Sequence, residues 1–254
     1  MKRFFIYFII IFSAPLASLV AQVAPQNVLD SANYYYSAGE YQKAIEKYNA
    51  LIDLGYKDAG LFYNLGNAYY KVNNMAYAIV NYERAARLDP VDEAIAYNLQ
   101  MAQSHIVDKM EPLPDFFIFR WVKYLRGSLS ADSWAILSLG VFVLSLLLFL
   151  GYLFATQMGL RKMAFWSALV LIFFTGVSLA FSLQNKKEQL TRDKAIIYAP
   201  SVTVKSAPDR SGTDLFMIHE GTKVELVDSV GPWFEVKLVD GNQGWIQKKD
   251  FIRI

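Results

Sequence analysis

The sequence predicts a multidomain membrane protein in which an all-α module precedes a two-helix hairpin and an all-β module comes after it. Three observations support this fold class: two uncharged apolar runs, a helical repeat before them, and short alternating segments after them. The 254 residues carry a net charge of only +2 and no cysteine. The chain therefore shows no basic bias toward nucleic acid, and disulfides and thiolate catalysis are excluded.

The apolar hairpin has two arms, Trp134–Thr156 and Met163–Leu183, and its connector carries Arg161 and Lys162. A helix rises about 1.5 Å per residue, so each arm can cross a hydrocarbon layer of about 30 Å. We expect membrane spans at 132–156 and 163–183 around a loop at 157–162. Two buried helices of a soluble protein are the alternative, but such helices seldom lack polar residues on every face.

Residues 1–21 have the pattern of a secretory signal peptide, with Lys2 and Arg3 before an apolar run and small residues after it. An uncleaved anchor helix is the alternative, and in either case the repeat module behind it is exported. We therefore expect a protein of the inner (cytoplasmic) membrane with both soluble modules in the periplasm and 157–162 in the cytoplasm. The basic residues that flank the hairpin would favour the opposite orientation: Arg120, Lys123, Arg126, Lys186 and Lys187.

An internal repeat with a period of 34 residues covers the region before the hairpin. Small and aromatic residues recur in register: Ala32, Tyr35, Ala44, Tyr48 and Leu51 match Gly66, Tyr69, Ala78, Tyr82 and Ala85. Together with Leu65–Lys71 and Pro90, this pattern resembles the tetratricopeptide repeat. The resemblance implies an all-α solenoid at 22–106, with two repeats and a capping helix at 93–105. Gly66 and Ala78 would lie where the two helices of a repeat cross.

In tetratricopeptide proteins, a stripe beside the helix-packing face lines the groove that holds a peptide or a partner helix. The equivalent residues here are the candidate partner-binding groove: Asn33, Tyr36, Tyr63, Asn67, Tyr70, Lys71, Tyr97 and Met101. The alternative is that these asparagines and tyrosines are common repeat residues without a binding role.

The segment 107–131 links the repeat module to the hairpin. Pro112 and Pro114 break the chain, and Phe116–Arg126 combines aromatic and apolar residues with basic ones. We expect this stretch to lie in the membrane interface, although a helix packed on the repeat module is the alternative. After the second span, 184–194 is expected to be a polar linker.

Residues 195–254 alternate in short segments separated by turn signals, which is typical of a small β-barrel. The motifs Glu220-Gly221-Thr222, Trp233-Phe234 and Gly244-Trp245-Ile246 resemble a bacterial SH3-like domain. Alternation places Trp233 and Trp245 outward, as candidates for a shallow peptide-binding surface. The alternative is that a tryptophan folds flat as a lid on the barrel.

The sequence lacks the phosphate-binding, dinucleotide-binding and hydrolase motifs that would indicate an enzyme. Its two histidines, His105 and His219, fall in different modules, so a metal site is not expected. We predict no catalytic, cofactor-binding or metal-binding residues, and no enzymatic activity.

The order of these parts is similar to that of the BatE-type member of the Bat aerotolerance family. The resemblance implies a membrane-anchored scaffold that mediates protein–protein interactions in the cell envelope. Its partners would be von Willebrand A-domain Bat proteins and, indirectly, a MoxR-type ATPase, with a link to oxidative stress. The alternative function is an envelope sensor or anchor that binds cell-wall peptide through the SH3-like domain.

Overall fold

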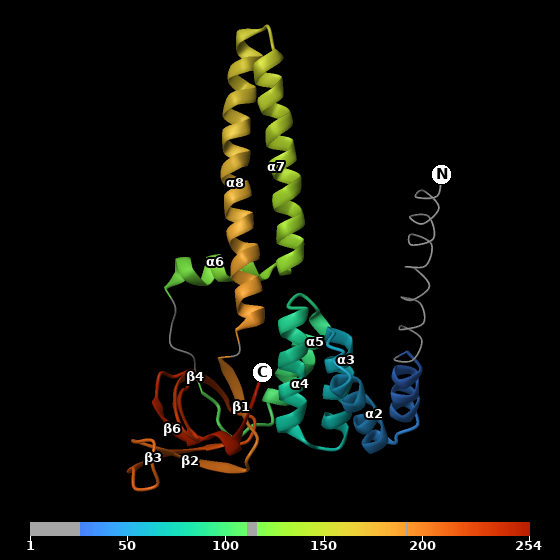
Figure 1. Ribbon diagram of the computed structural model, residues 1–254, viewed down its shortest axis with the longest axis vertical. Coiled ribbons are helices and arrows are strands. Elements are labelled where there is room, and N and C mark those ends of the chain that lie inside the picture. The colour runs from blue at the N-terminus through green and yellow to red at the C-terminus, as the bar shows by residue number, and fades with distance from the viewer. Residues whose placement is uncertain (1–25, 111–115, 192) are drawn as a thin grey trace, which may run out of the picture.

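The computed structural model describes residues 26–110, 116–191 and 193–254. A bundle of short helices and a curved sheet lie at one end of a long helical hairpin, and a short helix lies across the base of that hairpin (Figure 1). The expected signal peptide at 1–21 and the break at Pro112 and Pro114 fall outside the described residues.

In the described part of the chain, five helices form the repeat module. The first covers residues 26–37, and after it come α2 Tyr41–Asp53, α3 Ala59–Lys71, α4 Met75–Leu88 and α5 Glu93–Gln103. Side-chain oxygens of Asp58, Asn74 and Asp92 accept hydrogen bonds from backbone N–H groups in the first turns of α3, α4 and α5. These caps satisfy donors that have no partner inside the helix, and they fix where each helix begins.

The turn inside each repeat contains one residue in the left-handed region. Gly39 has a φ of 77° before α2, and Asn73 has a φ of 60° before α4. Glycine and asparagine tolerate this conformation better than other residues. These two positions are 34 residues apart. The backbone thus repeats with the period that the side chains predicted.

The crossing of α3 and α4 confirms the predicted register of the second repeat. A Cβ atom at Gly66 would lie 2.7 Å from two atoms of the Tyr82 ring, so the ring occupies the space that the missing side chain leaves. Ala78 is 0% exposed and Tyr82 is 1% exposed. The small residues allow the two helices to approach closely, and the tyrosine fills the contact between them.

The hairpin consists of α7, Ala131–Phe154, and α8, Met158–Leu190. Each helix is long and apolar enough to cross a membrane. Only 11% of its most apolar stretch of 18 residues is buried by the rest of the chain. A buried pair of helices in a soluble protein would hide far more of this surface.

The ends of α8 differ from the expected boundaries. The connection shrinks from the expected loop at 157–162 to residues 155–157, because Arg161 and Lys162 already belong to α8. The expected linker at 184–194 is helical as far as Leu190. Its lysine, glutamate and glutamine residues are strong helix formers, so the helix continues after the apolar run ends.

Serine hydroxyls connect the two arms of the hairpin. Ser145 Oγ donates to the Ala168 carbonyl oxygen at 3.0 Å, and Ser182 Oγ donates to the Ala131 carbonyl oxygen at 2.8 Å. Small hydroxyl residues of this kind let helices approach closely and satisfy their own polar groups where no water is present.

Helix α6, Phe117–Gly127, is fixed to the base of the hairpin by its last turn. Trp134 Nε1 donates to the Arg126 carbonyl oxygen at 2.9 Å, and Asn185 Nδ2 donates to the same oxygen at 3.2 Å. Along the rest of α6, Phe119, Trp121 and Tyr124 are 69%, 65% and 79% exposed. The helix therefore does not bury its aromatic residues against the repeat module.

The β module is one antiparallel sheet. Its strands are β1 Lys194–Ile197, β2 Ser201–Lys205, β3 Asp214–His219, β4 Lys223–Val230, β5 Trp233–Lys237, β6 Gln243–Gln247 and β7 Phe251–Arg253. A single 3₁₀ turn, Lys248–Asp250, precedes β7. The spatial order is β3-β2-β6-β5-β4-β1-β7, so β3 and β7 stand at the two edges. The sheet is open, and the closed barrel predicted from the sequence is not confirmed.

One hydrophobic core nevertheless joins both edges of the sheet. It includes Ile218 from β3 and Phe251 from β7, together with Phe234, Val236 and Ile246 from the central strands. Residues from opposite edges share a core only if the sheet curls around it, as Figure 1 shows. Phe234 and Val236, two residues apart on β5, both belong to this core.

Candidate functional site

The stripe of asparagine and tyrosine residues forms a hydrogen-bonded framework inside the repeat module. Tyr48 Oη donates to Asn33 Oδ1 at 2.7 Å, and Tyr82 Oη donates to Asn67 Oδ1 at 2.7 Å. Burial raises the pKa of Tyr48 to about 12 and also raises the pKa of Tyr82. Both phenols therefore remain protonated donors at neutral pH.

Asn98 extends this framework from α5. Its Nδ2 donates to Asn67 Oδ1 at 2.8 Å and to Tyr63 Oη at 3.0 Å. The Tyr63 ring also packs against the Tyr82 ring, with a distance of 6.1 Å between centroids. Two predicted groove residues, Tyr63 and Asn67, are thus brought together by Asn98, a residue that the sequence analysis did not select.

The remaining predicted groove residues differ in their surroundings. The ring centroids of Tyr36 and Tyr41 are 5.4 Å apart, and Tyr70 Oη lies 3.3 Å from His105 Nε2. Both tyrosines therefore have partners within the chain. Met101 is half-buried, whereas Lys71 is exposed and Tyr97 is 67% exposed. Tyr97 and Lys71 are therefore the predicted groove residues that the chain leaves most open to a partner.

The two tryptophans proposed as a binding surface of the β module are not equally accessible. Trp245 is half-buried, but Trp233 is only 8% exposed, so the expectation that both are open is wrong. Trp233 begins β5 and pairs across the sheet with Val230 and Gln247. Alternation predicts an outward side chain, but Trp233 is buried in the folded module and offers no open binding surface.

A polar contact that no sequence motif indicates joins the two soluble modules. Asp108 comes after α5, and its carboxylate accepts hydrogen bonds from the His219 backbone N–H and from Thr222 Oγ1, both at 2.6 Å. His219 Nδ1 lies 2.9 Å from the other carboxylate oxygen. Burial alone would raise the pKa of Asp108, but the hydrogen bonds from Thr222 and His219 outweigh burial and hold the pKa below its ordinary value.

An ion pair and an apolar contact complete this junction. Lys223 Nζ lies 2.6 Å from both carboxylate oxygens of Glu83 on α4. Ile79 and Val80 of α4 share a buried cluster with Ile196 of β1. No spacing in the sequence could have indicated these contacts, because Glu83 and Lys223 are 140 residues apart.

One segment of the repeat module matches a known family model. Residues 32–73 fit the family model described as TPR repeat. The chain contains a tetratricopeptide repeat. Tetratricopeptide repeat protein 16 from Mus musculus is 33% identical over 87 residues, which is 33% of this chain. The matched region spans only 11% of the mouse protein, about one ninth of its length.

Two solved structures are also similar, at low identity. The first TPR of Spaghetti (RPAP3), bound to an HSP90 peptide, is 14% identical with a TM-score of 0.30, covering 64% of this chain and 93% of that one. A T3SS complex from Aeromonas hydrophila is 16% identical with a TM-score of 0.32, covering 68% of this chain and 89% of that one.

The tetratricopeptide module is suited to binding rather than to chemistry. Such repeats are protein-interaction modules, and stacked repeats present an extended concave surface. Among residues 26–110, 116–191 and 193–254, no group of three or more histidine, aspartate or glutamate side chains is placed to hold a metal ion. The hydrogen bonds among asparagine and tyrosine side chains fix this stripe in one shape, and a preformed surface lowers the entropy cost of any binding.

Proposed function

We propose that this protein is a non-enzymatic, membrane-anchored adaptor whose tetratricopeptide groove holds a protein partner. One observation carries the proposal: Lys71 and Tyr97 remain exposed, whereas Asn67 and its partners Tyr82 and Asn98 are hydrogen-bonded within the module. Exposed tyrosines on a rigid support are frequent anchors of protein interfaces. Lys71 adds a positive charge that favours an acidic partner surface.

The hairpin supports the membrane anchoring in this proposal. Its arms expose apolar side chains along their whole length, and α6 presents exposed aromatic residues at its base. Tryptophan and tyrosine are enriched at the boundary between lipid and water. Both soluble modules lie at the same end of the hairpin (Figure 1). This arrangement supports placing them on the same side of the membrane.

The finer assignment rests on the order of the modules. We infer a Bat-type complex at the inner membrane, with the tetratricopeptide module and an SH3-like β module in the periplasm. The partners would be von Willebrand A-domain Bat proteins and, indirectly, a MoxR-type ATPase. The alternative role, binding of cell-wall peptide by the β module, has less support because Trp233 is 8% exposed.

The groove can be tested with a matched pair of double variants in the full chain. Lys71→Glu with Tyr97→Ala should reduce recovery of the partner in membrane crosslinking by roughly tenfold, because an interface tyrosine often contributes about 1 kcal/mol or more. The control is Tyr56→Ala with Lys57→Glu, which makes the same changes in the exposed loop between α2 and α3. Equal recovery from the two double variants would place the partner elsewhere.

The orientation needs a separate test. An alkaline phosphatase fusion after Ile254 should be active in a Gram-negative host, because the enzyme requires export to fold. An inactive fusion, with a cytoplasmic reporter active at the same point, would reverse the orientation without affecting the groove.

A further inference from the structure

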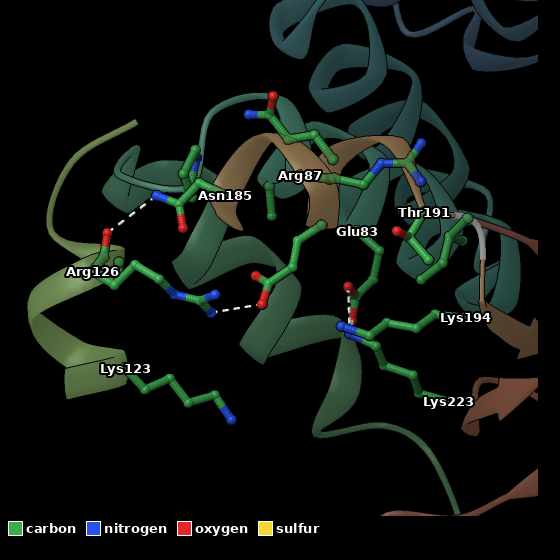
Figure 2. A pocket seen from close by; sticks show the side chains of 14 residues that line it. Glu83, Arg87, Lys123, Arg126, Asn185, Thr191, Lys194 and Lys223 are labelled. Atoms are coloured by element: carbon green, nitrogen blue, oxygen red, sulfur yellow. Dashed lines mark hydrogen bonds and ion pairs between the residues drawn. The ribbon is translucent and has the colours of Figure 1, made fainter. Parts of the chain in front are cut away.

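A cavity lies where the four parts of the molecule meet. Its volume is about 300 Å³, and its walls come from α4, the last turns of α6 and α8, and the β module (Figure 2). It therefore lies at the base of the hairpin, between the last turns of α6 and α8. Neither Lys71 and Tyr97 of the repeat groove nor Trp245 of the β module lines it.

The walls of this cavity are rich in basic residues. Five cationic side chains line it: Arg87, Lys123, Arg126, Lys194 and Lys223. Two carboxylates oppose them, and both are already engaged. Glu83 holds Lys223 at 2.6 Å, and Glu188 holds Arg126 at 2.7 Å. The five basic side chains come from separate segments of the chain, so folding gathers them around one cavity.

Arg126 also has a buried donor without an acceptor. The residue is 9% exposed, and its Nη1 has no hydrogen-bond partner among the described residues. Its guanidinium extends from α6 toward Glu188 in the cavity (Figure 2). A buried charged donor left unsatisfied is costly, and native proteins usually supply an acceptor.

We propose that this cavity binds the phosphate of an anionic phospholipid. Arginine and lysine are the residues that recognise phosphate, and the phosphate oxygens would supply the acceptor that Arg126 Nη1 lacks. The inference takes the membrane anchoring from the proposed function, and it does not depend on a partner in the groove.

The position of the cavity identifies the lipid as the source of the phosphate. If α7 and α8 span the bilayer, α6 lies at the headgroup level and Arg126 projects from its last turn. Basic pockets beside membrane helices are known to bind acidic headgroups. A bound lipid would contact α4, α6, α8 and β1 together, and would tie the soluble modules to the membrane surface.

The test uses the full chain in bilayer nanodiscs that contain phosphatidylglycerol and phosphatidylcholine. Native mass spectrometry of the extracted protein measures which lipid stays bound. Wild-type protein should retain phosphatidylglycerol, and Arg126→Gln should lower its affinity about tenfold because a charge-assisted hydrogen bond is lost. Lys194→Gln, at an exposed first residue of β1, should lower it about fivefold.

Arg120→Gln is the matched control. It removes the same charge from the same helix, but Arg120 does not line the cavity. It should keep the wild-type preference. Equal losses in Arg120→Gln and Arg126→Gln would overturn the proposal, since general attraction of α6 to the surface would explain both. If circular dichroism shows that Arg126→Gln does not fold, the comparison of lipid retention between Lys194→Gln and Arg120→Gln decides the proposal.

Inorganic phosphate distinguishes a lipid from a free anion. Phosphate at millimolar concentration should not displace the retained phosphatidylglycerol from wild-type protein. Displacement, or tight phosphate binding without any lipid preference, would overturn the lipid source. A chain that does not enter nanodiscs would refute the membrane anchoring as well, whereas one that enters without lipid preference refutes this inference alone.

Discussion

Two asparagines, Asn33 and Asn67, have the same task at equivalent positions of the two repeats. Each accepts a hydrogen bond from the buried tyrosine of the following helix, at 2.7 Å in both cases. Sequence reasoning could place them on the correct stripe, but it could not distinguish a ligand contact from an internal one. The difference depends on the rotamer of a tyrosine 15 residues away.

Removing the two tyrosine hydroxyls should have unequal effects. Tyr82→Phe should destabilise the module by about 1 kcal/mol, because half-buried Asn67 keeps only its bond from Asn98 and has less access to water than Asn33. Tyr48→Phe should cost less, because exposed Asn33 can bind water instead. Hydrogen exchange of the α3 and α4 amides measures both. A larger effect from Tyr48→Phe would contradict this account of the framework.

The contact of Asp108 predicts a dependence on pH. Its folded pKa lies below the ordinary value of about 4, so its contribution to stability is present above that value and is lost as pH falls through the folded pKa. As pH is lowered from 6 to 3, the urea midpoint of unfolding should therefore fall more steeply in wild-type protein than in Asp108→Asn. Parallel pH profiles would show that this carboxylate does not contribute.

At the scale of single elements, the periodic pattern of small, aromatic and apolar residues was enough to predict most helices. The repeat register, the crossing at Gly66 and the helical nature of α5, α6, α7 and α8 all result from local patterns. The predicted helix boundaries were wrong where polar residues replace apolar ones without a helix-breaking glycine or proline. Lys186 and Lys187 end the apolar run but favour helix, so α8 continues past them.

The helix crossing can be tested at Gly66. Alanine normally stabilises a helix by about 1 kcal/mol relative to glycine, but here its Cβ would meet the Tyr82 ring at 2.7 Å. We expect Gly66→Ala to destabilise the repeat module by about 1–3 kcal/mol, as overpacking does. Gly140→Ala in α7, where a Cβ meets no atom within 4 Å, is the control. Thermal unfolding of the repeat helices that is unchanged in Gly66→Ala would contradict the observed packing.

At the scale of the whole molecule, sequence reasoning predicted three modules but not that two of them pack together. The junction depends on Glu83, Asp108, His219 and Lys223. In the sequence, each is of a residue type that is common on protein surfaces. Their roles arise from long-range folding, which no local pattern encodes. The curl of the sheet and the burial of Trp233 have the same origin, because both depend on which strands become neighbours.

Charge reversal tests the junction. Glu83→Lys should loosen the two modules because it places two cations together, and Lys223→Glu should do the same with two carboxylates. The double variant restores opposite charges and should recover most of the loss. Limited proteolysis of the segment between α5 and α6 reports the loosening. If the double variant is cleaved as fast as the summed effects of the two single variants predict, the ion pair does not contribute directly to holding the modules together.

The separation of Glu83 and Lys223 along the chain has a consequence for biosynthesis. The repeat helices are made first, and domains generally fold in order of synthesis. The side of α4 that carries Ile79 and Val80 can be covered only after β1 has been made. Lys223 of β4, the partner of Glu83, comes 140 residues after it. At translation rates of about 5–20 residues per second, this delay is roughly 7–30 s. During that interval this apolar face of α4 is uncovered, and it becomes buried only when the C-terminal sheet packs against it.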